Sequence, residues 1–491
     1  MKRVLFKLVL SLTLLCFIAC EKKETSQNEY ADFIKELNEL DIHTSNILVY
    51  KNGEIIFQNA DGIQNIDGNV PLTLNSQFRL ASVSKQFTGM AIMKLKEHGK
   101  LDYDQTVQSI LSEFPYETIT VRHLLNHVSG LTDYMRIIDA HFKPSNDLEL
   151  LGNNEIIEMF YEVNPPLDFQ PEEKWAYSNT GYMFLASIVE ELSGKHLRDF
   201  FNEQIFEPIG MEDTMLFQYQ TEPNPELPNR VFGYQLELDQ VTLKANDYNL
   251  LNKVRGDGGI YSTLNDLYKW NQALVNYTII PKEYLDEAWK PTVLKDGTIQ
   301  KYGFGWGIDS DENEPMVVSH SGGWVGFATY LYNEVHSNSG FIYLSNNSGE
   351  NFGAVLRGLS NIMKGESYEL PKKSIEKEMA KTFYMGSTSD GINAYHKLKN
   401  ETLTYESSEA NLNVLGYQLM NEKKLNAALA VFKLNLEEYP NSANTYDSYG
   451  DALLEKGDSI SALKHFQKSF EMDSTLTISR DKADNLKEVL N

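Results

Sequence analysis

Phe78-Arg-Leu-Ala-Ser-Val-Ser-Lys-Gln-Phe87 is the most informative segment of this 491-residue chain. It contains Ser82 and Lys85 in the spacing S-x-x-K and runs directly into a predicted helix over residues 86–98. Positions i and i+3 of a helical turn face the same side, so a neutral lysine amine can accept the serine proton and generate a nucleophile. The positive end of the helix would then lie beneath the reacting carbonyl. Because serine and lysine are common in helices, this spacing needs support from elsewhere in the chain.

Two later motifs supply that support. Trp175-Ala-Tyr177-Ser178-Asn179 contains the triplet Y-x-N, and in an extended segment Tyr177 and Asn179 can point into one cleft. The tyrosine oxygen can relay protons, and the asparagine amide can hold both the lysine and a substrate. Val318-Ser-His320-Ser321-Gly322-Gly323 contains the triplet H-x-G. On an edge strand, this triplet would present backbone donors and a polar side chain to an extended substrate.

Apolar and turn-forming residues predict the elements around these motifs. A hairpin is predicted over residues 47–57, since Asn52-Gly53 is a preferred pair for a type I′ turn. Further strands are predicted over residues 316–319, 327–332 and 341–345, and further helices over residues 121–126, 181–192, 263–274 and 352–363. Strands at both ends with helices between them indicate an α+β unit whose sheet is closed by distant segments.

In the order S-x-x-K, Y-x-N, H-x-G, the motifs resemble the serine β-lactamase and penicillin-binding-protein superfamily. The nearest resemblance is to its branch of class C β-lactamases, D-alanyl-D-alanine carboxypeptidases and family VIII esterases. Three further stretches fit that branch: residues 120–131, 258–262 and 302–307. The resemblance covers roughly residues 47–363. It implies a β-lactamase-like antiparallel sheet flanked by helices, with an inserted helical subdomain and the active site between them.

The resemblance also implies roles for the motif residues. Ser82 would be the acylated nucleophile, and Lys85 and Tyr177 would share the general base and acid duties. Asn179 would position Lys85 and the substrate. Neither a metal nor another cofactor is expected in such a site.

His320 stands where many relatives of this superfamily have the lysine of K-T-G. The oxyanion hole would be formed by the backbone N–H groups of Ser82 and Gly323, with Gly322 in the same strand. A lysine carries a permanent charge for a substrate carboxylate, whereas a histidine need not be charged at neutral pH. The substrate therefore stays open among a D-amino-acid peptide, a small ester and a β-lactam, and weak β-lactam turnover is expected.

The N-terminal residues 1–20 are predicted to be an export signal. Basic residues precede the twelve-residue apolar run Leu8–Ala19, which is too short to span a bilayer as a helix. The run ends in Phe17-Ile18-Ala19-Cys20, which resembles a bacterial lipoprotein signal with cleavage before Cys20 and lipid on its sulfur. An ordinary signal peptide is the alternative. A lipid-anchored protein of the bacterial cell envelope, on the periplasmic or surface side, is expected, with residues 21–29 as a polar tether.

The C-terminal residues follow a 34-residue repeat typical of tetratricopeptide (TPR) helices. Gly416, Ala428 and Phe432 recur as Gly450, Ala462 and Phe466, each 34 positions later. Residues 375–382 and 392–398 are predicted to form a degenerate helical pair, and residues 479–490 a solvated cap helix. We therefore expect a hydrolase domain over residues 30–366, a linker over 367–374 and an all-α TPR solenoid over 375–491, whose concave face would bind a protein or peptide partner.

Composition excludes several other classes. The formal net charge of −25 disfavours nucleic-acid binding, and the two cysteines, both before residue 21, exclude a disulfide scaffold or a cysteine zinc site downstream. His123 and His127 are four residues apart but do not match H-E-x-x-H, which favours a structural role. The sequence thus predicts a serine hydrolase. The alternative is an inactive penicillin-binding-like scaffold that recruits a partner through its repeats; the intact Ser82, Lys85 and Tyr177 favour the enzyme.

Overall fold

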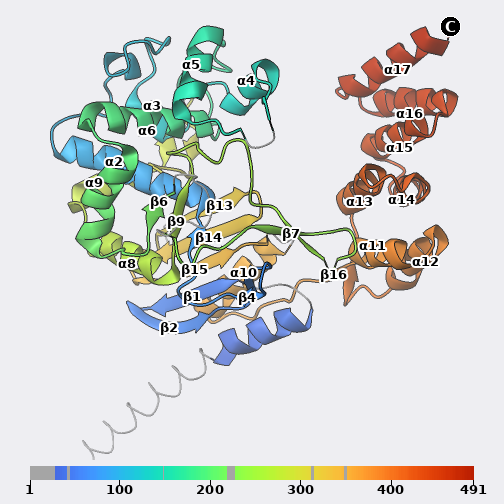
Figure 1. Ribbon diagram of the computed structural model, residues 1–491, viewed down its shortest axis with the longest axis horizontal. Helices are drawn as coiled ribbons and strands as arrows, with labels where there is room; N and C mark the ends of the chain where they lie inside the picture. Colours follow the sequence, from blue (N-terminus) through green and yellow to red (C-terminus); the bar gives the residue numbers. More distant parts are fainter. Residues whose placement is uncertain are drawn as a thin grey trace, which may run out of the picture. The chain divides into compact units, whose positions relative to one another are not determined.

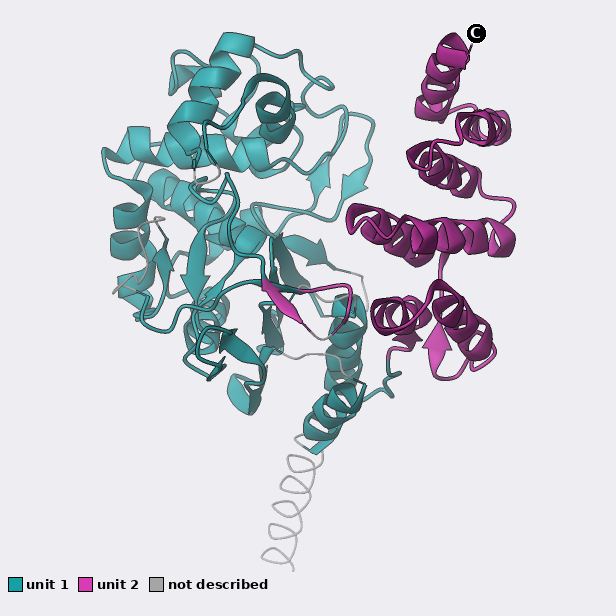
Figure 2. Cartoon of the chain, turned by 45° about the vertical axis from the view of Figure 1, so that its right-hand side comes forward, with its two compact units in different colours: residues 1–235, 245–370 teal, residues 236–244, 371–491 magenta. Residues whose placement is uncertain are grey.

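The computed structural model describes residues 28–40, 45–146, 149–217, 227–240, 242–310, 315–347 and 351–490. The predicted signal segment with Cys20, and the tether as far as residue 27, lie outside these residues. The chain divides into two compact units (Figure 2), one made of residues 1–235 and 245–370 and the other of residues 236–244 and 371–491. Among the described residues, no helix has the length and apolar character needed to cross a membrane.

The first unit is built on a six-stranded sheet in the order β12-β13-β14-β15-β1-β2, with every neighbouring pair antiparallel. Its strands are β1 (Asn46–Lys51), β2 (Glu54–Asn59), β12 (Gly307–Asp309), β13 (Val317–Trp324), β14 (Phe327–Glu334) and β15 (Ser339–Ser345). Figure 1 shows the blue strand β1 beside the orange strand β15, although most of the unit separates them in sequence. The predicted closure of the sheet by distant segments is confirmed. The predicted turn is also confirmed, since Asn52 and Gly53 have φ values of 52° and 74°.

The two faces of this sheet pack against different helices. Because side chains alternate along a strand, Leu48 and Tyr50 of β1 join the large core, whereas Ile47 and Val49 join a second core. The second core is completed by helical residues 28–39 and by α10 (Phe352–Lys364). The antiparallel sheet flanked by helices agrees with the predicted β-lactamase-like fold.

The large core is covered by helices that lie between β2 and β12 in the chain. The turns and helices there are η1 (Ala81–Ser84), α2 (Lys85–Glu97), η2 (Val107–Ser109), α3 (Val121–Leu125), α4 (Tyr134–His141), α5 (Asn153–Val163), α6 (Asn179–Ser193), α7 (Leu197–Phe201), the π-helical turn η3 (Asn202–Phe206), η4 (Glu207–Ile209), α8 (Leu264–Val275) and α9 (Lys282–Ala288). The predicted helices at 86–98, 121–126, 181–192 and 263–274 are confirmed within about two residues at each end. The sequence patterns did not predict α4, α5 or α9.

Short strands complete the first unit, and one of them directly precedes the turn that contains Ser82. A three-stranded sheet contains β5 (Phe78–Arg79), β9 (Ile260–Ser262) and β6 (Met215–Leu216), in the order β5-β9-β6. The remaining short pairs of this unit are β3 (Ile63–Asn65) with β4 (Val70–Pro71) and β10 (Thr292–Val293) with β11 (Ile299–Gln300). The strands β7 (Tyr234–Leu236) and β8 (Leu243–Ala245) pair with each other and include residues of the second unit. The β5–β9 pairing joins the residues that precede Ser82 to the segment that follows Gly258.

The second unit consists mainly of successive helices that pack on their neighbours. They are α11 (Ile375–Met385), α12 (Thr388–Leu398), α13 (Glu409–Asn421), α14 (Leu425–Glu438), α15 (Ala443–Glu455), α16 (Ser459–Met472) and α17 (Thr477–Leu490), with a small parallel pair β16 (Lys373–Ser374) and β17 (Tyr405–Glu406). A Cβ on Gly416 would meet the Phe432 ring at 2.5 Å, and one on Gly450 would meet the Phe466 ring at 2.6 Å. The same contact therefore recurs 34 residues later.

Candidate active site

Ser82 lies in a tight turn between β5 and α2. The 3₁₀ turn η1 spans Ala81–Ser84, and in such a turn positions i and i+3 are eclipsed, which brings the side chains of Ser82 and Lys85 to the same side. Ala81 has a φ of 48°, a left-handed conformation that costs roughly 1–3 kcal/mol for a residue with a Cβ. The surrounding packing holds this strained backbone directly before the predicted nucleophile.

Lys85 is fully buried and donates three hydrogen bonds from Nζ. The acceptors are Ser82 Oγ at 3.2 Å, Asn179 Oδ1 at 2.8 Å and the backbone carbonyl of Asp257 at 2.9 Å. The amide and carbonyl oxygens can only accept, so a neutral amine keeps those two bonds and turns its lone pair toward Ser82 Oγ. This geometry suits removal of the serine proton by the lysine.

Tyr177 covers the same lysine from the solvent side. The centre of its ring lies 4.8 Å from Nζ of Lys85, and the residue is 39% exposed. Its hydroxyl has no hydrogen-bond partner among the described residues, which leaves it available to a substrate. Asn179 is the first residue of α6, whose N-cap is Ser178, so the Y-x-N triplet runs into a helix rather than forming the predicted extended segment. The two side chains still converge on Lys85.

His127 holds the segment that carries Tyr177. Its Nδ1 accepts a hydrogen bond of 3.0 Å from the backbone N–H of Ser178, and its carbonyl accepts one of 3.0 Å from Ala176. The His127 ring centre lies 4.4 Å from that of Tyr177. Burial keeps the pKa of His127 well below its usual value, which is consistent with Nδ1 acting as an acceptor. His127 thus fixes the backbone on both sides of Tyr177.

The H-x-G motif lies in the part of β13 that has a neighbouring strand on one side. Strand β12 pairs only with Val317–Ser319, whereas β14 pairs along the whole of β13. A Cβ on Gly322 would come within 2.1 Å of the carbonyl oxygen of Leu80, so glycine allows this strand to pack against the turn that contains Ser82. Gly323 follows it and lines a cavity with Ser82.

The His320 side chain is enclosed by the protein, whereas the sequence predicted that it would face a substrate. It is buried, its Nδ1 lies 2.6 Å from the Ser321 carbonyl, and its Nε2 lies 2.9 Å from the hydroxyl of Tyr302. The carbonyl can only accept, so Nδ1 carries the hydrogen and Tyr302 donates to Nε2. Burial lowers the pKa of His320 to about 3. A neutral His320 with both nitrogens bonded inside the protein supports β13.

A cavity of about 210 Å³ opens beside Ser82. Its lining includes Asn179 and Gly323, and also three residues that the motifs did not identify: Arg79, Asp257 and Trp324. Asp257 accepts a hydrogen bond of 2.8 Å from the hydroxyl of Tyr134, and burial raises its pKa. The sequence did offer a signal for Arg79, which lies inside the S-x-x-K segment, and for Asp257, which directly precedes Gly258-Gly259.

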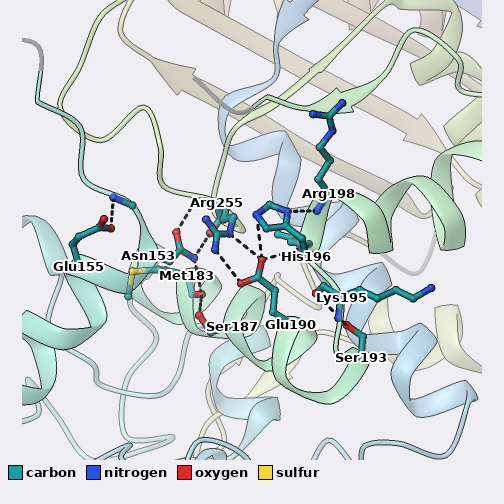
Figure 3. A network of polar contacts seen from close by, with 12 residues as sticks. Asn153, Glu155, Met183, Ser187, Glu190, Ser193, Lys195, His196, Arg198 and Arg255 are labelled. Carbon is teal, nitrogen blue, oxygen red and sulfur yellow. Dashed lines mark hydrogen bonds and ion pairs between the residues drawn. The ribbon is translucent and has the colours of Figure 1, made fainter. Parts of the chain in front are cut away.

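Polar contacts anchor the loop that presents the Asp257 carbonyl (Figure 3). Arg255 donates from Nε and Nη2 to the carboxylate of Glu190 in α6, at 3.1 and 3.0 Å. Asn153, at the start of α5, accepts from the Arg255 backbone N–H at 2.9 Å and donates to its carbonyl at 3.0 Å. Thr88 of α2 donates to the carbonyl of Gly256 at 2.6 Å. Three helices thus position the third acceptor of Lys85.

Comparison with known proteins agrees with this fold and arrangement. The family model described as Beta-lactamase matches residues 31–360. Penicillin-binding protein 4* of Bacillus subtilis (strain 168) is 32% identical over 401 residues, which cover 78% of this chain and 88% of that protein. D-aminopeptidase of Brucella anthropi is 28% identical over 57% of this chain, which spans about half (52%) of that relative.

Solved structures of related proteins have a similar fold. The octameric penicillin-binding protein homologue from Pyrococcus abyssi has a TM-score of 0.60 and 25% identity, with coverage of 69% of this chain and 77% of that one. D-amino acid amidase from Ochrobactrum anthropi SV3 has a TM-score of 0.56 and 21% identity, with coverage of 70% and 98%. This second likeness concerns the fold alone.

Proposed function

This chain belongs to the beta-lactamase family, and we propose that it is an exported serine hydrolase that forms a covalent acyl-enzyme on Ser82. The observation that supports this most strongly is the set of three bonds from Lys85 Nζ, to Ser82, Asn179 and the Asp257 carbonyl. Two acceptor-only groups orient the amine toward the serine, as a general base requires. An inactive scaffold would have no need for this arrangement.

In the proposed reaction, Ser82 Oγ bonds to the substrate carbonyl carbon as its proton passes to the neutral Lys85 amine. The backbone N–H groups of Ser82 and Gly323 face the negative oxygen that develops. Collapse of this intermediate breaks the amide or ester bond, and the leaving group receives the proton from Lys85 through the Tyr177 hydroxyl. Water then attacks the acyl carbon as Tyr177 and Lys85 take its proton. The bond from this carbon to Ser82 Oγ breaks, the proton passes from Lys85 to Oγ, and the acid product leaves Ser82 in its starting state.

We propose an amide or ester with a D-amino-acid character as the substrate. Among the relatives are proteins named D-aminopeptidase and penicillin-binding protein, which supports D-amino-acid peptides over other amides. A small ester and a β-lactam remain within the same acylation chemistry. Since His320 is neutral and buried, we expect β-lactams to be poorer substrates than D-peptides or small esters.

For the second unit we propose a TPR module that binds an extended protein or peptide partner. The Gly416–Phe432 and Gly450–Phe466 contacts, repeated at an interval of 34 residues, support this assignment. The bond from the Tyr417 hydroxyl to Asp451, at 2.8 Å, also links residues 34 positions apart. The N-terminal sequence supports export and lipid attachment at Cys20, on the membrane of a bacterial envelope.

Turnover of three substrate types tests the hydrolase proposal. A nitrophenyl ester, a D-alanyl-D-alanine peptide and nitrocefin are offered to the wild type, to Ser82→Ala and to the matched control Ser84→Ala. The Ser84 hydroxyl accepts from the backbone N–H of Ile260 at 3.3 Å and does not contact Lys85 Nζ, so this variant should keep turning over substrate. Loss of turnover in Ser82→Ala alone is expected. Equal turnover by the wild type and Ser82→Ala would overturn the proposal.

A further inference from the structure

Arg79 places a buried positive charge in the wall of the cavity. It lies in β5, three residues before Ser82, and is 3% exposed. It lines the cavity together with Ser82 and Gly323. An arginine keeps its charge at every pH at which proteins are folded, and buried arginines are normally paired with a carboxylate.

The hydrogen-bonding capacity of Arg79 is largely unused. A guanidinium has five N–H donors, yet the described residues accept a single hydrogen bond from it, a long one of 3.4 Å from Nη2 to the Asn252 carbonyl. Its Nε is buried without a partner, and no described carboxylate lies within ion-pair distance of it. Leaving a buried charged donor unpaired is costly unless a ligand completes it.

The groups around Arg79 orient it, and none of the described carboxylates forms an ion pair with it. The Trp324 ring centre lies 5.9 Å from Cζ, and the Trp324 indole N–H donates to Asn252 Oδ1 at 2.8 Å, so the ring is held in place. The titratable groups that face Arg79 are Asp257, Tyr134 and Tyr261, and burial raises the pKa of each, whereas the charge of Arg79 acts in the opposite direction. Asp257 is bonded to the Tyr134 hydroxyl rather than to Arg79.

We propose that Arg79 binds a carboxylate of the substrate inside the cavity and so selects anionic substrates. The proposal rests on the hydrolase function proposed above and narrows its substrate class to acyl compounds with a free carboxylate, such as peptides that end in a D-amino acid. A planar guanidinium matches a carboxylate with two parallel hydrogen bonds. Arg79 would supply the positive charge that the neutral His320 does not.

Matched substrate pairs test this inference. One pair is mono-4-nitrophenyl glutarate and 4-nitrophenyl butyrate, which differ by a carboxylate on the acyl side. The other is N-acetyl-D-alanyl-D-alanine and its C-terminal amide, which differ on the leaving-group side. We expect Arg79→Gln to lower kcat/KM for both members of a pair, but the loss should be roughly 10- to 100-fold larger for the carboxylate member in at least one pair. This additional loss should come mainly from a higher KM.

Two further variants keep the test decisive. Arg357→Gln removes one exposed arginine from α10 and should leave the preference within each pair unchanged. Arg79→Lys keeps the positive charge but loses the planar guanidinium, so it should also reduce the preference for the carboxylate substrate. This variant replaces Arg79→Gln if Arg79→Gln unfolds below the assay temperature. Equal losses for both members of each pair, or a wild type without preference for a carboxylate, would overturn the inference. A wild type that hydrolyses none of the four compounds would instead contradict the proposed function.

Discussion

Oδ1 of Asn179 accepts a hydrogen bond of 2.8 Å from Nζ of Lys85, although 94 residues separate them in the chain. Both residues begin helices, Lys85 as the first residue of α2 and Asn179 as the first of α6. Each side chain is therefore fixed by a helix start that packs into the large core. The lysine amine is held by the fold and does not depend on a substrate to position it.

The first prediction concerns the charge state that Lys85 must reach. Lys85→Arg should lower kcat/KM roughly 10²- to 10⁴-fold, nearly as much as Lys85→Ala, because arginine cannot give up its proton. Steady-state kinetics with a nitrophenyl ester would measure both. An arginine variant with more than a tenth of wild-type activity would contradict a base role for Lys85.

The second prediction concerns the Tyr177 hydroxyl. Tyr177→Phe keeps the ring that lies 4.8 Å from Lys85 Nζ and removes only the oxygen, so most activity should be lost, by roughly 10²-fold or more. Thermal melting should stay near the wild-type value, since the hydroxyl has no partner among the described residues. Near-normal kcat would show that Tyr177 only packs against the lysine.

The third prediction follows from the buried neutral histidine at position 320. Its folded-state pKa of about 3 lies below the unfolded value of about 6.5, so the unfolded chain binds an extra proton between these values. Stability should therefore fall as the pH drops below 6.5, by up to about 1.4 kcal/mol per pH unit for this residue. Urea unfolding at pH 5 and 6 should show a shallower pH dependence in His320→Gln. An unchanged slope would argue against a buried neutral His320.

The fourth prediction concerns the anchor of the Asp257 loop. Glu190→Gln weakens the paired bonds to Arg255 and should cost about 1–2 kcal/mol of stability, and kcat should fall more than KM rises because the third acceptor of Lys85 shifts. Glu203→Gln breaks the exposed pair with Lys195 and should cost less than about 0.5 kcal/mol, without an effect on kcat. Similar kinetics for the two variants would show that the Arg255 loop does not position Lys85.

Much of this architecture could be predicted from local signals. The pair Asn52-Gly53 predicted the hairpin, and the spacing of Ser82 and Lys85 predicted their shared side, because both depend on neighbouring residues. The Asp257 carbonyl could not be predicted, since a backbone acceptor leaves no trace in residue type. The burial of His320 depends on Tyr302, a contact between chain segments that local patterns do not reveal.

The helices α4 and α5 were missed although the sequence carries local signals for them. Asp133 caps α4 by accepting from the backbone N–H of Met135. Ile137 in α4 and Phe160 in α5 lie on apolar faces that pack into the large core. Arg79 was missed because an arginine in a strand is usually exposed. Its significance follows from its burial beside the cavity.

The most direct test of a Ser82 acyl-enzyme is mass spectrometry of the peptide that contains this residue. The wild type is incubated with a fluorophosphonate or a penicillin, digested and analysed, with Ser82→Ala and Ser84→Ala treated in the same way. We predict one adduct, on Ser82, present in the wild type and in Ser84→Ala and absent from Ser82→Ala. An adduct on another residue, or an equal adduct in Ser82→Ala, would contradict the assignment of Ser82 as the nucleophile.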